Sequence, residues 1–183
     1  MSGPSPRVAI IGAGLTGLLK AHDLKKGGFE VVLFNKEESL DVRLRDWPIS
    51  LHWGLPALKS LLSESALANF PKALSRPHLE YTPDVESMLC INGKTGEVMI
   101  KSVVPGLRRI TRQRLRRILA AEFESAGAIQ WGKRLEKLDV DDEHHDQPVR
   151  MVFADGTTAE ADYVLGTDGT SSKTRELLFR DDP

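Results

Sequence analysis

The chain has 183 residues, a formal net charge of −1, 40% hydrophobic and 28% charged residues, and near-average glycine and proline, which exclude collagen-like and disordered classes. The balanced charge argues against a nucleic-acid partner, and no apolar run approaches the roughly 18 residues of a membrane span. The start of the chain lacks the features of a signal peptide and Cys90 has no partner in the chain, so we expect a cytoplasmic protein without membrane association.

The first predicted elements form a βαβ unit. Residues 8–11 are a short apolar run, typical of a strand that is buried on both faces of a parallel sheet. A helix follows from Leu15 and ends at the glycines 27–28, and residues 30–34 form a second strand. This succession predicts an α/β fold with a central parallel sheet.

The rest of the chain is expected to complete one domain over residues 1–183. Residues 36–105 are predicted to be a loop-rich insertion with a short helix at 55–62 and a hairpin at 88–100. After it, Thr111 is expected to cap a helix that ends at Gly127. Further strands are predicted at 129–131, 135–140, 149–153 and 163–165, and a last helix at 174–179.

Six residues between the first strand and its helix fit the pattern G-x-G-x-x-G. The first glycine allows a tight turn, the second lets a pyrophosphate approach the backbone, and the third lets the helix pack closely. The helix N-terminus adds unpaired N–H groups. Because a strand precedes the pattern and a helix follows it, dinucleotide binding is favoured over a purely structural turn. The six residues are Gly12, Ala13, Gly14, Leu15, Thr16 and Gly17.

The acid that usually binds the adenosine ribose, at the end of the second strand, is missing. Asn35 stands there and can bond one hydroxyl without a charge, while Lys36 beside it can meet a phosphate. These two residues therefore leave three interpretations open. The first is NADP binding, the second is FAD binding with a weakened ribose contact, and the third is a simple turn after the strand.

Six arginines lie within residues 108–117, four of them in the helix that Thr111 begins. The apolar face of this helix includes Leu115. Arg112 falls within the same face, and Arg116 falls at its edge. A buried guanidinium needs a partner, so if Arg112 points inward it is expected to meet either a phosphate or a structural carboxylate. Arg114 and Arg117 fall outside this face and are interpreted as solvated.

A second candidate ligand edge follows the strand at 163–165. Asp168 and Gly169 lie where ligands bind in open α/β sheets, beyond the carboxyl end of a strand. The alternative is a turn followed by Ser171 or Ser172 as the cap of the last helix.

Other candidates are interpreted as structural. Trp47, Trp53 and Trp131 are expected to be packing anchors rather than residues that stack on a cofactor. The histidines 144–145 have no second cluster at ligand spacing, so no metal is predicted. No catalytic residue or oligomeric state can be assigned from the sequence.

Together, three motifs resemble the N-terminal part of the FAD-dependent aromatic hydroxylases, which are single-component flavin monooxygenases. The resemblance spans nearly the whole chain, and residues 47–54 and 129–133 are similar to fungal members. It implies a Rossmann-like FAD/NAD(P)-binding domain with a small β-rich insertion. The motifs are Gly12-x-Gly14-x-x-Gly17, Thr111-Arg112-x-x-Leu115-Arg116 and Asp168-Gly169-x-Ser171-Ser172-x-Thr174-Arg175.

The resemblance also implies roles for individual residues. The glycine turn would hold the FAD pyrophosphate, and Asn35 would stand in the place of the ribose-binding Glu. Arg45 and Arg112 would line the phosphate and ribityl side of the flavin. Asp168 and Gly169 match an Asp-Gly motif that serves both FAD and NADPH.

The implied activity is hydroxylation of an aromatic or polyketide-like small molecule with NADPH and oxygen. Two departures qualify this expectation. The loss of the acid at Asn35 weakens ribose binding by about 1 to 3 kcal/mol. No Gly-Asp dipeptide occurs, although the family carries one farther along a longer chain, so the C-terminal part of the family fold is expected to be absent. The alternatives are a truncated, non-catalytic flavin-binding module and an NADP-binding reductase.

Overall fold

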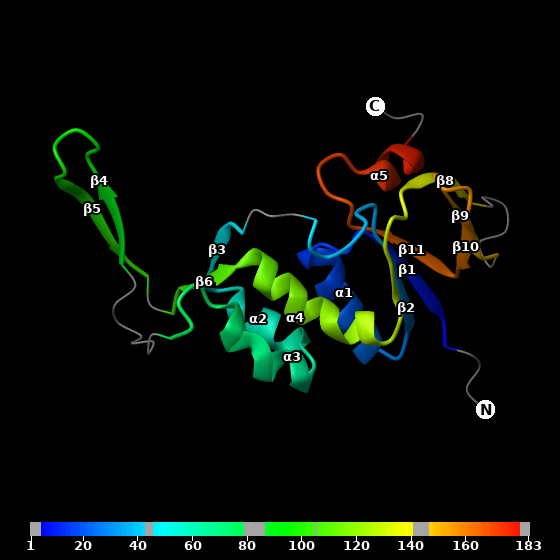
Figure 1. Ribbon diagram of the computed structural model, residues 1–183, viewed down its shortest axis with the longest axis horizontal. Coiled ribbons are helices and arrows are strands. Elements are labelled where there is room, and N and C mark those ends of the chain that lie inside the picture. The colour runs from blue at the N-terminus through cyan, green and yellow to red at the C-terminus, as the bar shows by residue number, and fades with distance from the viewer. Residues whose placement is uncertain (1–4, 43–45, 79–86, 105, 141–146, 180–183) are drawn as a thin grey trace.

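A four-stranded parallel sheet lies between the helices and a second, antiparallel sheet (Figure 1). The structure, a computed structural model, describes residues 5–42, 46–78, 87–104, 106–140 and 147–179. In the order β11-β1-β2-β7, the strands are β11 (Tyr163–Gly166), β1 (Arg7–Ile11), β2 (Glu30–Phe34) and β7 (Ile129–Gln130). The parallel direction of all three pairings confirms the predicted sheet.

This sheet is covered on both faces. Val8 and Ile10 of β1 pack into the core beneath the helices, whereas Ala9 and Ile11 pack with Phe153 on the other side. Successive side chains of a strand point to opposite faces, so a strand covered twice must be apolar throughout. The covering elements are α1 (Leu15–Lys26) and α4 (Arg112–Ser125) on one face, and the antiparallel sheet β8 (Leu135–Asp139), β9 (Val149–Phe153) and β10 (Thr158–Ala161) on the other.

The segment between β2 and α4 is more regular than predicted. The helix expected at 55–62 is confirmed as α2 (Leu55–Leu61). It is followed by α3 (Glu64–Asn69) and the short 3-10 helix η1 (Phe70–Ala73), which the sequence patterns did not indicate. The strands β3 (Pro48–Leu51) and β6 (Arg108–Thr111), which pair antiparallel, and β10 were also missed. Each has four residues, too few for a clear alternation.

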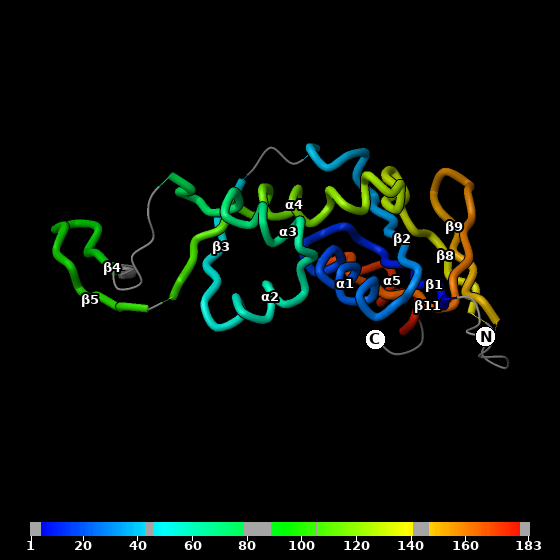
Figure 2. Tube along the Cα trace, turned by 90° about the horizontal axis from the view of Figure 1, so that it is seen from below, coloured from blue at the N-terminus to red at the C-terminus, as the bar shows by residue number. Residues whose placement is uncertain are grey.

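The predicted hairpin is confirmed as β4 (Ser87–Ile91) and β5 (Val98–Val103), which pair only with each other among the described strands. It projects from the body of the molecule in both views (Figures 1 and 2). Met99 and Ile100 are 65% and 63% exposed. The last predicted helix is α5 (Lys173–Leu178). Across the described ranges, no helix has the length and apolar character that crossing a membrane requires.

Candidate functional site

The glycine turn between β1 and α1 has the geometry that its sequence predicts. Gly12 has a φ of +111°, a left-handed conformation that favours glycine. A Cβ at Gly17 would lie 2.0 Å from the carbonyl oxygen of Gly12, so this glycine is needed for packing. A Cβ at Gly14 would meet no atom within 4 Å. The space beside Gly14 is therefore open, as close approach of a ligand requires.

The helix N-terminus at this turn carries unpaired donors. Gly14 is the N-cap of α1 and supplies no side-chain cap, and the first turn holds no acidic residue. The amides of an uncapped first turn, together with the positive end of the helix dipole, favour an anion. The turn is fixed from the neighbouring strand end, because the Thr167 hydroxyl donates to the carbonyl oxygen of Gly12 at 2.8 Å.

Asp168 lies next to this turn and organises the loop before α5. Its carboxylate accepts hydrogen bonds from the Ser172 hydroxyl (2.5 Å) and from the backbone N–H (3.0 Å) and hydroxyl (3.2 Å) of Thr174. Burial alone would raise the pKa of Asp168, but the hydrogen bonds outweigh burial and hold this pKa below its ordinary value. Ser172 caps α5 by accepting from the N–H of Arg175, so the predicted cap is confirmed.

The start of α4 forms the opposite side of the site. Thr111 is the N-cap residue, as predicted, but its side chain makes no capping bond. The Asp46 carboxylate instead accepts from the N–H of Gln113 at 3.1 Å, and the carbonyl oxygen of Trp47 accepts from the N–H of Arg112 at 3.3 Å. The segment just before β3 is thereby tied to the first turn of α4.

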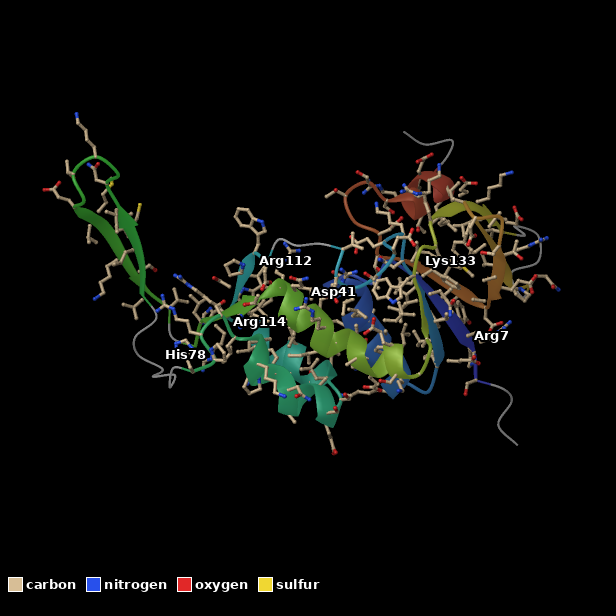
Figure 3. All side chains as sticks on the ribbon, in the orientation of Figure 1. Arg7, Asp41, His78, Arg112, Arg114 and Lys133 are labelled. Atoms are coloured by element: carbon tan, nitrogen blue, oxygen red, sulfur yellow. The ribbon has the colours of Figure 1, made fainter. Side chains whose placement is uncertain are left out.

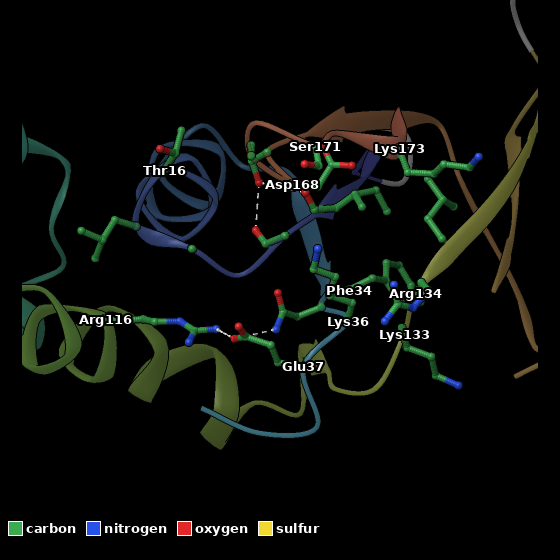
Figure 4. A pocket seen from close by; sticks show the side chains of 18 of the residues that line it. Thr16, Phe34, Lys36, Glu37, Arg116, Lys133, Arg134, Asp168, Ser171 and Lys173 are labelled. Atoms are coloured by element: carbon green, nitrogen blue, oxygen red, sulfur yellow. Dashed lines mark hydrogen bonds and ion pairs between the residues drawn. The ribbon is translucent and has the colours of Figure 1, made fainter. Parts of the chain in front are cut away.

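These parts enclose a cavity of about 1160 Å³ (Figure 4). The turn, the end of β2, the start of α4 and the loop after β11 all contribute, so the structure brings together the three separate sequence motifs. The lining carries seven basic and four acidic side chains, a balance that favours an anionic ligand. The basic residues are Lys36, Arg112, Arg116, Lys133, Arg134, Lys137 and Lys173, and the acidic ones are Glu37, Glu136, Asp168 and Glu176.

Most of the predicted site residues line this cavity. Ala13 and Gly17 are buried in the turn itself and do not line it. Arg45 and the histidines 144–145 lie outside the described residues. Within the described part, no group of three or more possible metal ligands occurs. The predicted residues that line the cavity are Gly12, Gly14, Leu15, Thr16, Asn35, Lys36, Arg112, Asp168 and Gly169.

Asn35 is turned toward the glycine turn. It is 7% exposed, and its Oδ1 accepts from the N–H of Ala13 at 3.1 Å. Its Nδ2 donates to Glu37 Oε2 at 3.4 Å. Lys36, by contrast, is exposed at the cavity. The site thus holds a carboxylate at Glu37, two residues beyond the place where the sequence pattern seeks one.

The prediction that Arg112 is the inward-facing arginine of α4 was wrong. Arg112 is exposed at the cavity and lies at the first position of α4 (Figure 3). The buried guanidinium is that of Arg116, one turn later, whose side chain is 11% exposed and paired with Glu37 at 2.9 Å. The helical wheel places both side chains on similar sides of α4, but of the two only Arg116 is covered by a neighbouring part of the fold.

Lys133 lines the cavity but was not predicted as a site residue, and two of the three tryptophans differ from their interpretation. Lys133 Nζ donates to Asp155 at 2.5 Å and to Thr157 at 2.8 Å. The hydrogen bond from Lys133, together with those from the Thr157 hydroxyl and N–H, lowers the pKa of Asp155 to about 2. Trp47 and Trp53 are 65% and 89% exposed, so the packing-anchor interpretation was wrong for both. Trp131 does pack against the core, as expected.

Comparison with known proteins gives a consistent set of relatives, although no family model matches the chain. The chain is 31% identical over 183 residues to the FAD-dependent monooxygenase phnB of Penicillium herquei, covering 99% of this chain and 42% of the relative. It is 30% identical to the 6-hydroxynicotinate 3-monooxygenase of Bordetella bronchiseptica, covering 95% and 43%. A structure of Klebsiella pneumoniae HpxO complexed with FAD and uric acid superimposes with a TM-score of 0.71 at 20% identity, covering 93% and 41%. The chain therefore spans about two fifths of the length of the proteins it matches.

Proposed function

Because this chain is homologous, over almost its whole length, to part of the FAD-dependent monooxygenases, we propose that its cavity binds FAD with the diphosphate at the glycine turn. The observation that carries the proposal is the open space beside Gly14, at an uncapped helix N-terminus. The predominantly basic lining supports the same placement, since a diphosphate carries two negative charges.

The residues present fit the other parts of FAD as well. The end of β2, with Asn35 and Lys36, is the side on which dinucleotide-binding folds place the adenosine ribose. The opposite side, with Trp47, Arg112 and Gln113, then faces the flavin end. Bound FAD would supply the redox chemistry, and the protein's part is to orient the flavin and to exclude water.

A titration tests FAD binding directly. We expect the purified chain to bind one FAD, measured by calorimetry, and to bind NADPH alone far more weakly. Tight NADPH binding without FAD binding would instead support an NADP-binding reductase, for which exposed Lys36 is the supporting observation. Absence of any FAD binding at millimolar concentration would rule out the proposed function.

For the whole protein we propose hydroxylation of an aromatic or polyketide-like small molecule with NADPH and oxygen. The relatives named above support this class, because their names describe monooxygenases and one acts on 6-hydroxynicotinate. The competing function is a module that binds flavin without turnover. NADPH oxidation by the FAD-loaded chain, with and without candidate phenols, separates the two. Bound FAD that NADPH never reduces would support the module.

Trp47 provides an optical test of which side of the cavity holds the flavin. Its indole is 65% exposed and lines the cavity, so a planar ring at this end can stack on it. We expect FAD to quench tryptophan fluorescence, and Trp47→Phe to remove the largest share of this quenching. The dissociation constant should rise about threefold, in line with the roughly 0.5 to 1.5 kcal/mol of an aromatic pair.

Trp53→Phe is the matched control. Trp53 is 89% exposed but does not line the cavity, so its replacement should leave both quenching and affinity unchanged. Undiminished quenching in Trp47→Phe would show that the flavin lies elsewhere.

A further inference from the structure

Arg116 joins the buried part of α4 to the glycine turn. Its Nε donates to the carbonyl oxygen of Ala13 at 2.8 Å, and its Nη2 donates to Glu37 Oε2 at 2.9 Å. The guanidinium also lies 5.6 Å from the centre of the Trp131 ring. The side chains of Arg116 and Glu37 are 11% and 12% exposed, so this ion pair is largely shielded from water.

The Glu37 carboxylate is also linked to the glycine turn through Asn35. Asn35 donates from Nδ2 to Glu37 Oε2 and accepts from the N–H of Ala13 through Oδ1. The N–H and the carbonyl oxygen of Ala13 are therefore both held, one by Asn35 and one by Arg116. Figure 4 shows Arg116 and Glu37 joined in this way beneath the turn. We call Arg116, Glu37 and Asn35 the Ala13 clamp.

The Ala13 clamp restrains a turn whose backbone would otherwise be flexible. Ala13 stands between Gly12 and Gly14, and glycine has more backbone freedom to lose than any other residue. An unrestrained turn would have to be ordered when the ligand binds, at a cost in affinity. Fixing both polar groups of Ala13 orders the turn beforehand.

We propose that Arg116 is a positioning residue for the diphosphate subsite, acting through the Ala13 clamp. The inference rests on the proposed function, because it assumes that an adenine dinucleotide binds at this turn. It gives Asn35 a role in holding the turn rather than in recognising the ribose. The contact that distinguishes this role from simple neutralisation of Glu37 is the bond from Arg116 Nε to Ala13.

The test compares ADP with AMP, which differ by one phosphate. In wild type, ADP should bind more tightly than AMP, because its diphosphate reaches the turn. Arg116→Gln combined with Glu37→Gln removes both charges, so that no unpaired buried charge destabilises the fold. We expect this double variant to lose about tenfold in affinity for ADP and less than threefold for AMP, measured by calorimetry.

Two further variants complete the design. Arg116→Lys keeps a cation for Glu37 but lacks the rigid planar fork whose Nε and Nη2 reach Ala13 and Glu37 separately, so it should also reduce the preference for ADP. Arg117→Gln is the matched control, because Arg117 is 48% exposed and pairs with exposed Asp41. It should bind both nucleotides as wild type does.

The outcomes are distinguishable. A folded double variant with an unchanged ratio of AMP to ADP dissociation constants would overturn the role of Arg116 while leaving FAD binding intact. Equal weakening of both nucleotides would also overturn it, since that pattern indicates a general structural effect. Wild type that binds neither ADP nor FAD would overturn the proposed function together with this inference.

Discussion

Gly17→Ala is expected to lower the free energy of unfolding by about 3 kcal/mol, whereas Gly14→Ala should leave it nearly unchanged. A Cβ at Gly17 would lie 2.0 Å from the carbonyl oxygen of Gly12, so the backbone itself must move. A Cβ at Gly14 meets nothing within 4 Å, and its φ of −80° suits any residue. Urea denaturation measures both effects.

For ligand binding, Gly14→Ala is the informative variant. Its methyl group enters the space that the proposed diphosphate occupies, so the dissociation constant for FAD should rise at least about tenfold, or about 1.4 kcal/mol. Gly93→Ala is the control, because Gly93 lies in the hairpin turn and a Cβ there also meets nothing within 4 Å. Unaltered FAD affinity in Gly14→Ala would mean that the diphosphate of FAD does not lie against this turn.

The features predicted correctly from the sequence are those that short-range rules determine. The alternation of packing along β1 follows from two covered faces, and the G-x-G-x-x-G spacing follows from the geometry of one turn. Both depend on residues within a few positions of one another. The parallel sheet could therefore be predicted, and so could the convergence of Gly14 and Asp168 at one edge of it.

Long-range pairing explains what was missed. The cap of α4 comes from Asp46, 67 residues before Gln113, and the partner of Arg116 is Glu37, 79 residues earlier. No local pattern marks either pair. The helical wheel places Arg112 and Arg116 on similar sides, but only the tertiary fold decides which of them is covered.

Asp168 illustrates why the two sequence interpretations of the late loop need not exclude each other. Its carboxylate organises the cap of α5 through Ser172 and Thr174, as the structural alternative predicts. The residue also lines the cavity beside the glycine turn. A ligand contact at Asp168 remains a prediction, whereas its role in the loop is visible in the hydrogen bonds.

Asp168→Ala is expected to lower the free energy of unfolding by about 2 kcal/mol, because it leaves the donors of the loop without their carboxylate. Asp168→Asn keeps one acceptor oxygen and should cost about half as much. Ser172→Ala removes the cap of α5 but leaves the carboxylate in place, so it is the matched control for binding. If Asp168 also contacts FAD, Asp168→Asn weakens FAD binding more than Ser172→Ala does.

The pH dependence gives an independent check of the same residue. The pKa of Asp168 is lowered in the folded state, so its carboxylate binds a proton less readily there than in the unfolded chain. The stability that it contributes is therefore fully present above the unfolded pKa, about 3.9, and is lost as the pH falls through the lower folded value. Wild type should lose its advantage over Asp168→Asn in this acidic range, measured by urea denaturation at successive pH values. An advantage that persists unchanged at low pH would show that the charge of Asp168 does not hold the loop.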